Sequence, residues 1–178
     1  MSYLLGLSGS LRKDATNTKL MRAAAASYGG AFQEGNLRLP LYDGDLEEAE
    51  GIPTDVQVLA DQISGATAIV ISTPEYNKAL SGVLKNALDW VSRADGNPWA
   101  GKPVAILSAT AGRAGGERAQ ANLRLSMVAF RPRIVQGPEV LVGGNFKEFD
   151  ENGQLIAESY IKAATGLMAA LRAEVELI

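Results

Sequence analysis

The strongest constraint on the fold is the recurrence of short, nearly continuous aliphatic runs. Four such runs fall at residues 3–7, 37–39, 66–71 and 104–107, and a less regular fifth candidate lies within 133–142. Strands that are covered on both faces have this pattern, because neither face meets water. Gly137 and Pro138 interrupt the fifth candidate, so its limits are the least defined. The runs predict the buried strands of a parallel sheet.

Between these runs the apolar residues change to a helical period. Helices are expected at residues 16–28, 56–63, 81–93 and 117–130, with a last amphipathic stretch at 160–171. Gly29 and Gly30 end the first helix, because glycine adopts the left-handed conformation that satisfies the final carbonyls. Strands alternating with helices predict a doubly wound α/β fold with helices on both faces of the sheet. Residues 42–54 and 94–102 are expected to be loops.

The composition favours one globular domain over residues 1–178. Hydrophobic residues make up 47% and charged residues 21% of the 178, and the net charge is −3. A sequence pI near 5.1 does not favour nucleic acid or an anionic membrane as a partner. No run reaches the ~20 apolar residues that cross a bilayer, and the amino terminus lacks the basic segment of a secretory signal. A cytoplasmic protein is therefore expected.

Cysteine and histidine are both absent. Their absence excludes disulfides, thiolate nucleophiles, imidazole bases and the usual zinc ligands. No metal site is expected, and any redox chemistry would need a bound cofactor.

Ligands of an open parallel sheet bind beyond the carboxyl ends of its strands, and the loop after the first run has the residues of an anion site. Ser8, Ser10, Arg12 and Asn17 lie between the run and the next helix. The amides at a helix N-terminus bind phosphate, and arginine adds a bidentate contact. Alternatively, Ser10, Thr16 or Asn17 only caps the helix. No P-loop or G-x-G-x-x-G motif occurs, which argues against a P-loop site for ATP or GTP and against a Rossmann site for a dinucleotide.

The loops after the third and fourth runs have other signals. Residues 74–77 have the sequence Pro-Glu-Tyr-Asn, which can frame a flat, heteroatom-rich ring. Alternatively, these residues are only structural: the proline shapes a turn, the tyrosine packs on a neighbour, and Ser81 caps the helix. The later loop, 108–116, contains Gly112, Gly115 and Gly116. These glycines allow close approach to a ligand, but loops also use glycine for conformational reasons alone.

Four segments together resemble the NAD(P)H-dependent FMN reductase family, the flavodoxin-like group that includes bacterial quinone, chromate and azo-compound reductases. They are GSLRKDATN at 9–17, LPLYDGDL at 39–46, TPEYNKALSGVLKNALDW at 73–90, and the glycine-rich turn after Ser108. The resemblance implies a flavodoxin-like, doubly wound, five-stranded parallel sheet of strand order 2-1-3-4-5. It also implies FMN as the cofactor, with NADPH or NADH as electron donor.

The resemblance assigns the FMN phosphate to Ser10, Arg12 and Asn17, one side of the flavin ring to residues 74–77, and the other side to residues 108–116. The predicted cofactor-binding residues are Ser8, Ser10, Arg12, Thr16, Asn17, Thr18, Pro74, Glu75, Tyr76, Asn77, Ser108, Thr110, Gly112, Gly115 and Gly116. One departure is Ala15, where the family often has serine. Thr16 or Thr18 is expected to supply the missing hydroxyl.

The implied activity is electron transfer from NAD(P)H to quinones or similar small acceptors by a ping-pong mechanism. Flavin N5 would carry the chemistry, so no side chain is assigned a catalytic role. Arg113 and Arg118 are candidates for the phosphates of the nicotinamide nucleotide, with solvated surface charge as the alternative. Tyr42 and Asp43 are candidates for shaping substrate access, with aromatic packing on a proline turn as the alternative.

The family also forms homodimers or homotetramers, and Trp90 is a candidate for such an interface, with burial in the core as the alternative. Two functions of other classes stay open. One is a flavodoxin-like carrier of single electrons between proteins, although such carriers tend to be more acidic than this chain. The other is a binding or regulatory module that has lost the flavin, for which Ala15 is the one hint.

Overall fold

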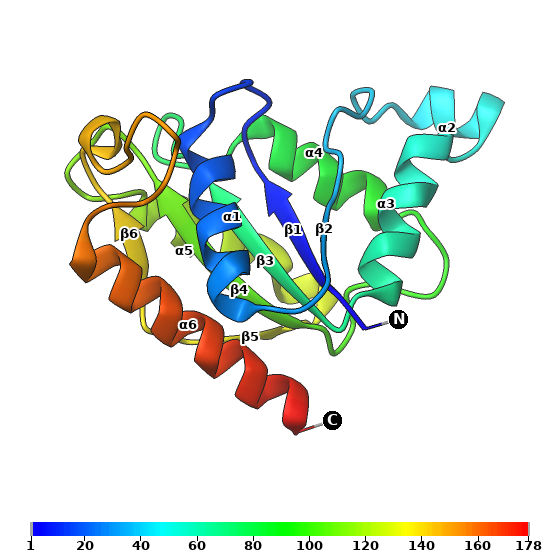
Figure 1. Ribbon diagram of the computed structural model, residues 1–178. Helices are drawn as coiled ribbons and strands as arrows, with labels where there is room; N and C mark the ends of the chain where they lie inside the picture. Colours follow the sequence, from blue (N-terminus) through cyan, green and yellow to red (C-terminus); the bar gives the residue numbers. More distant parts are fainter. Residues whose placement is uncertain (1, 178) are drawn as a thin grey trace.

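The sheet of the computed structural model, which describes residues 2–177, is parallel throughout (Figure 1). Its strand order is β2-β1-β3-β4-β5, with β6 also paired to β4. The strands are β1 (Leu4–Ser8), β2 (Phe32–Glu34), β3 (Ala68–Thr73), β4 (Pro103–Ala109), β5 (Arg133–Ile134) and β6 (Val140–Val142). The predicted strand order 2-1-3-4-5 is confirmed.

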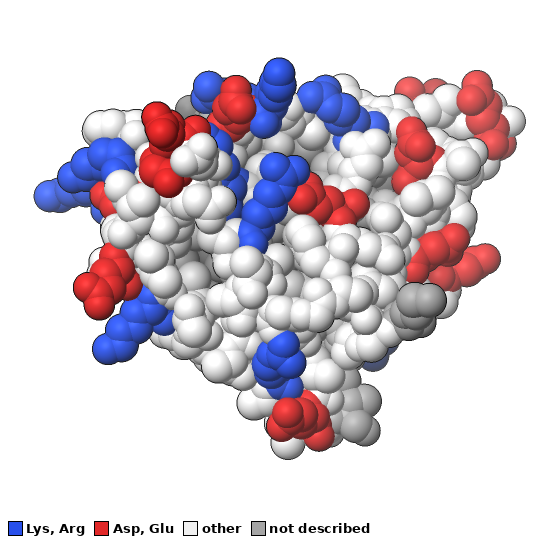
Figure 2. Space-filling view, viewed as in Figure 1, with Lys and Arg blue, Asp and Glu red and all other residues white. Residues whose placement is uncertain are grey.

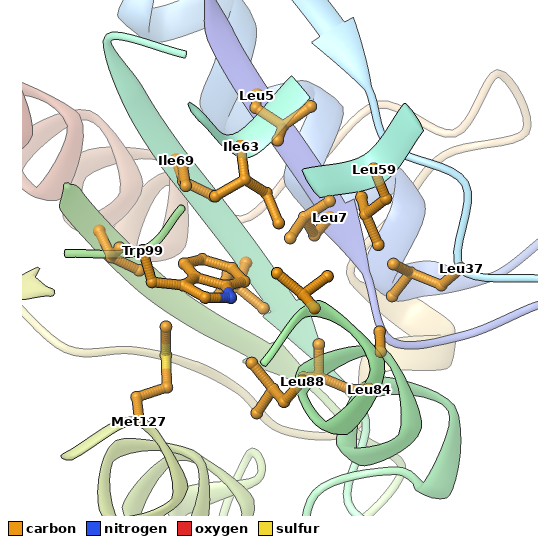
Figure 3. Packing of buried hydrophobic residues seen from close by; sticks show 14 of the residues in the cluster. Leu5, Leu7, Leu37, Leu59, Ile63, Ile69, Leu84, Leu88, Trp99 and Met127 are labelled. Carbon is orange, nitrogen blue, oxygen red and sulfur yellow. The ribbon is translucent and has the colours of Figure 1, made fainter. Parts of the chain in front are cut away.

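The alternation of side chains along the central strands builds two helical layers. Ile69 and Ile71 of β3 pack with α3 (Thr54–Gly65), α4 (Gly82–Val91) and α5 (Glu117–Met127). Ala68 and Val70 of the same strand pack with α1 (Thr16–Tyr28) and α6 (Glu158–Glu176) on the other face. Figure 3 shows the first of these layers: Leu59 of α3 and Leu84 and Leu88 of α4 lie around Leu7 of β1, and Trp99 lies between Ile69 and Met127. Both faces of the sheet are therefore covered, as the continuous apolar runs predicted.

The position predicted for the second strand was wrong. Residues 37–39 form no strand, and β2 lies earlier in the chain, where Phe32 and Gln33 pair with Leu4 and Leu5. Leu37 is nevertheless buried in the core. Because β2 is an edge strand in which Gln33 and Glu34 are exposed, it has no aliphatic signal, whereas the loop that follows it contains Leu37 and Leu39.

Two further details differ from expectation. Within residues 42–54, predicted as loop, the chain forms α2 (Gly44–Glu50), whose N-terminus is capped by the Asp43 carboxylate accepting from the Asp45 amide. This helix buries no side chain, so it has no apolar periodicity to detect. The single strand expected within 133–142 is divided into β5 and β6 by Gly137 and Pro138, and both parts pair with β4. The sheet accordingly has six strands rather than five.

The longest helix described is α6, with 19 residues. Among residues 2–177, none is long and apolar enough to cross a membrane. That residues 1–178 form a single domain stays a prediction.

Substituting two glycines with positive φ separates the cost of a steric clash from the cost of backbone strain. A Cβ on Gly115 (φ +63°) would lie 2.4 Å from the carbonyl atoms of Leu141, whereas a Cβ on Gly96 (φ +81°) would meet nothing within 4 Å. We expect Gly115→Ala to lower the free energy of unfolding by about 2–5 kcal/mol, because overpacking adds to the cost of a left-handed alanine, and Gly96→Ala by about 1–2 kcal/mol. Urea unfolding of both variants measures the difference, and equal losses would contradict this account.

Candidate functional site

A cavity of about 250 Å³ lies at the carboxyl edge of the sheet, between the loops that follow β1, β3 and β4. It is lined by Ser10, Arg12, Ala15, Thr16, Asn17, Pro74, Glu75, Tyr76, Ala109, Thr110, Ala111 and Asn145. The structure therefore brings together residues from all three predicted loops. Of the predicted site residues, those outside this lining are Ser8, Thr18, Asn77, Ser108, Gly112, Gly115 and Gly116.

The amino terminus of α1 opens onto this cavity without a side-chain cap. Ala15 occupies the N-cap position and makes no side-chain hydrogen bond, and the helix begins at Thr16. The amides of the first turn are thus left for another acceptor, and the dipole of the helix favours an anion there. Arg12, an exposed side chain on the rim, adds a full positive charge. This end of the cavity is suited to a phosphate group.

The Asn17 side chain is bonded to the ends of two strands. Its amide nitrogen donates to the carbonyl of Ala109 (2.9 Å), and its amide oxygen accepts from the Ala109 amide (3.0 Å) and from the Ser72 hydroxyl (2.9 Å). The residue is 3% exposed. All of this side chain's hydrogen bonds in the structure go to the ends of β3 and β4. Asn17 therefore fixes the start of α1 against the sheet, a contact we call the Asn17 clamp.

The two threonines that follow Ala15 point to different places. The Thr18 hydroxyl donates to Ser8 Oγ (2.8 Å), and both side chains lie outside the cavity lining. The Thr16 hydroxyl lies in the lining and accepts from Asn145 Nδ2 (2.6 Å). Of the two candidates for a hydroxyl beside Ala15, Thr16 is the one placed at the cavity.

The loop after β3 is a tight hairpin at the mouth of the cavity. Tyr76 and Ala79 exchange backbone hydrogen bonds of 3.1 Å around Asn77 (φ 50°) and Lys78 (φ 66°). Positive φ at both central residues is the type I′ geometry that joins antiparallel strands. Tyr76 is 53% exposed and lines the cavity, while Asn77 lies at the tip of the turn. The hairpin thus presents an aromatic ring and backbone groups to a ligand.

Two contacts hold this hairpin in place. Glu75 Oε2 accepts from the Ala119 amide (3.2 Å) in the first turn of α5, a helix whose N-cap, Gly116, has no side chain. Pro74 lies against the β1 loop, where a Cβ on Gly9 would come within 3.0 Å of the proline ring. The carboxylate of Glu75 therefore connects the cavity wall to α5, in the helix layer that also contains α3 and α4.

The glycine-rich turn after β4 is shaped mainly by its own packing. The Ser108 hydroxyl donates to the Gly115 carbonyl (2.6 Å) and accepts from Gln120 Nε2 (2.8 Å). A Cβ on Gly116 would lie 2.7 Å from Ser108 Cβ. These contacts fit the conformational reading of the glycines, and Thr110 and Ala111 are the residues of this turn that reach the cavity.

Asn145 is a cavity residue that sequence reasoning missed. It follows Gly144 (φ +57°) just after β6, and its amide donates to the Thr110 carbonyl (3.1 Å) while its side chain holds Thr16. The division of the fifth strand hid this loop, because β6 was not expected to end near the site. A glycine pair directly after a short apolar run, Gly143-Gly144, was the available signal.

The remaining candidates lie outside the cavity lining. The Tyr42 hydroxyl donates to Glu47 Oε2 (3.0 Å), which raises the pKa of Tyr42, and the ring meets Trp90 edge to face at 5.0 Å. Trp90 is fully buried, as the core alternative predicted, and donates to the Pro40 carbonyl. Arg113 and Arg118 are exposed.

The surface charge around the site is mixed. Figure 2 shows lysine and arginine side chains, interspersed with acids, along the upper edge where the loop after β1 lies. Acidic side chains gather instead over α2 and α3, on the right of the same view. An anion at the cavity would therefore depend on local contacts rather than on the net charge of −3.

Comparison with protein families matches residues 3–147 to one described as NADPH-dependent FMN reductase. An NAD(P)H-dependent FMN reductase of Pseudomonas aeruginosa is 40% identical over 156 residues, which cover 86% of this chain and 84% of that protein. A quinone reductase of Escherichia coli is 37% identical over 169 residues, covering 92% and 90%.

A solved structure supports the same similarity. FerB of Paracoccus denitrificans, described as a flavoenzyme NAD(P)H:(acceptor) oxidoreductase, superposes with a TM-score of 0.88 at 31% sequence identity. The superposition covers 99% of this chain and 98% of FerB. The flavodoxin-like sheet expected from the sequence is thereby confirmed.

The Asn17 clamp can be tested by stability. Asn17→Ala leaves the buried amide and carbonyl of Ala109 unpaired, so we expect a loss of about 2–4 kcal/mol in the free energy of unfolding, whereas Ser72→Ala removes one bond and costs about 1 kcal/mol. Urea unfolding monitored by circular dichroism measures both. A loss for Asn17→Ala no greater than that for Ser72→Ala would contradict the clamp.

Proposed function

The chain belongs to the NADPH-dependent FMN reductase family, and we propose that it transfers electrons from NADPH or NADH to quinones or similar small acceptors through FMN held in the cavity. The observation that carries the proposal is the uncapped start of α1 beside Arg12, at the carboxyl edge of the sheet. The quinone reductase similarity supports a quinone as acceptor. The chain is an oxidoreductase that uses FMN and NAD(P)H.

The residues present fit FMN at both ends of the cavity. Ser10, Arg12 and Thr16 lie where a phosphate would meet the first-turn amides of α1, and Asn17 would contribute its backbone amide while its side chain holds the strands. At the other end, Pro74, Tyr76 and Thr110 would border the ring. Thr16 would take the place of the family's serine at Ala15. These assignments are our proposal for the cofactor-binding residues.

The predicted residues that lie outside the cavity lining would support the site indirectly. Ser8 Oγ accepts from the Thr18 hydroxyl of α1 and from the Ser10 amide, and Ser108 donates to the Gly115 carbonyl, so these side chains fix the ends of the two loops. Gly115 and Gly116 would serve the same purpose by permitting close packing, with Asn77 and Gly112 placed in turns beside the cavity. Mutations of these residues would thus act through loop geometry.

FMN, when bound, supplies the two-electron chemistry that this chain's side chains lack. The protein's part is to bind and orient: the hairpin at 74–79 and the turn after β4, each held by its own backbone hydrogen bonds, would border the ring and fix its position. No acid–base side chain is needed, consistent with a sequence without histidine or cysteine. We propose that NAD(P)H and the acceptor enter beside Tyr76 in turn, which is a ping-pong sequence.

One assay distinguishes this function from its two alternatives. Purified protein with added FMN, NADPH or NADH, and a benzoquinone should oxidise the nucleotide, with parallel double-reciprocal plots at varied quinone. A one-electron carrier would bind FMN and show its visible spectrum without turnover. A flavin-free module would give neither colour nor turnover, and either result would overturn the proposal.

Replacement of Arg12 tests the phosphate assignment. We expect Arg12→Ala to raise the Kd for FMN about 10- to 100-fold, because charge-assisted hydrogen bonds to phosphate are lost, and to leave the Kd for riboflavin unchanged. Isothermal titration calorimetry measures both constants, with Arg172→Ala on α6 as a matched control. Equal weakening of FMN and riboflavin would show that Arg12 does not contact the phosphate.

Replacement of Arg113 tests the preference for the nucleotide. If Arg113 meets the 2′-phosphate, Arg113→Ala should raise the KM for NADPH by about tenfold and change the KM for NADH little. Steady-state kinetics with both nucleotides measures this. Equal effects on the two KM values would argue against the contact.

Assembly into a homodimer or homotetramer and a cytoplasmic location stay predictions. Burial of Trp90 in the core removes that side chain as a candidate for the interface.

A further inference from the structure

A second and larger cavity, of about 430 Å³, runs along α1 beside the proposed cofactor site. We call it the α1 groove; it is lined by Lys13, Asp14, Ala15, Thr18, Lys19, Arg22, Ala23, Ala26, Glu151, Asn152, Gly153 and Gln154. One wall is α1, and the other is the segment that precedes α6, which lies beside α1 in orange in Figure 1. Ala15 lines both the groove and the cofactor cavity. The two spaces therefore meet at the proposed phosphate position.

The outer wall of the groove is already ordered by its own hydrogen bonds. Asp150 Oδ1 accepts from the amides of Asn152 (2.9 Å) and Gln154 (2.8 Å), and its amide donates to the Gln154 carbonyl. Across the groove, the stem of Lys19 lies against Gly153, where a Cβ would come within 3.2–3.4 Å of it. A ligand laid along the groove would displace only this long, flexible side chain, while the backbone of both walls keeps its place, which limits the cost of binding.

The charges of the groove favour a phosphorylated ligand at one end. Among residues 2–177, the structure pairs neither Lys13 nor Lys19 with a carboxylate, whereas Arg22 is held by Glu34 in an exposed ion pair. Lys13 lies in the same loop as Arg12, at the end that meets the cofactor cavity. Anionic groups would therefore be held where the two spaces join.

The rest of the groove offers the groups that a nucleoside needs. Ala23 and Ala26 give methyl surface for a planar base, and Asn152 and Gln154 give amide groups for its edges. Asp14 and Glu151 would repel phosphate, but their carboxylates can accept hydrogen bonds from ribose hydroxyls, as acidic residues do in dinucleotide sites. From Ala15 to Ala26 the helix rises about 16 Å, enough for a nucleotide laid along it.

We propose that the α1 groove is a subsite for an adenosine phosphate, the adenylate half of FAD, whose flavin half would occupy the cofactor cavity. The volume of about 430 Å³ lies within the usual range for small-molecule sites. The proposal rests on the proposed function for the position of the flavin phosphate. The same chemistry occurs in the adenylate of NADH, so the experiment separates these two sources.

Calorimetric titrations of the full chain with FMN, FAD and riboflavin test the proposal, together with 5′-AMP added to the FMN-loaded protein. We expect wild-type protein to bind FAD within about tenfold of FMN, and Ala26→Phe, which fills the groove, to raise the Kd for FAD about tenfold or more without changing that for FMN. Lys19→Ala should raise the FAD constant about three- to tenfold. Ser27→Phe, an exposed neighbour outside the groove lining, is the control for added bulk.

Three other results would each overturn part of this account. If Ala26→Phe abolishes binding of AMP and raises the KM for NADH but leaves FAD unchanged, the groove takes the adenylate of the nucleotide donor, which overturns the FAD assignment. If neither FAD nor AMP responds to Ala26→Phe, or if FMN weakens equally, there is no adenylate subsite. If FMN itself fails to bind, the proposed function fails, and AMP titration of the unloaded protein still reports on the groove.

Discussion

The site depends on one set of buried hydrogen bonds, those of the Asn17 amide group to Ala109 and Ser72. Parallel strands end at one edge without a covalent connection there, so the helix after β1 needs a contact that fixes its start relative to β3 and β4. The clamp provides it in a nearly dry environment, where such bonds are geometrically strict. The first-turn amides, the cavity and its rim are all positioned relative to this contact.

Interior residues made the fold predictable, and surface elements escaped prediction. The aliphatic runs at β1, β3 and β4 report burial on two faces, and their alternation places the helical layers. Both β2, with Gln33 and Glu34, and α2 are mostly solvated, so their formation depends on backbone pairing and capping that hydrophobic patterns do not record. Residues 37–39 were predicted as a strand because Leu37 is apolar. Its burial explains the error, since a buried loop residue and a buried strand residue have the same hydrophobic pattern.

The candidate site was predictable by region but not by individual role. Its three loops follow from the rule for parallel sheets, and the family motifs give the ligand. Which hydroxyl faces the cavity depends on side-chain partners. The Thr18 hydroxyl bonds to Ser8, and the Thr16 hydroxyl bonds to Asn145, which lies 129 positions after Thr16 in the sequence. Such long-range pairing is set by tertiary packing, which local sequence cannot specify.

The uncapped start of α1 has a consequence for how this site changes in evolution. Every amino acid except proline has a backbone N–H donor. Binding of an anion through these donors therefore does not depend on which side chain precedes the helix. Replacing a serine by the alanine at position 15 therefore leaves these donors available to a ligand, and only one hydroxyl contact would have to come from a neighbouring residue such as Thr16.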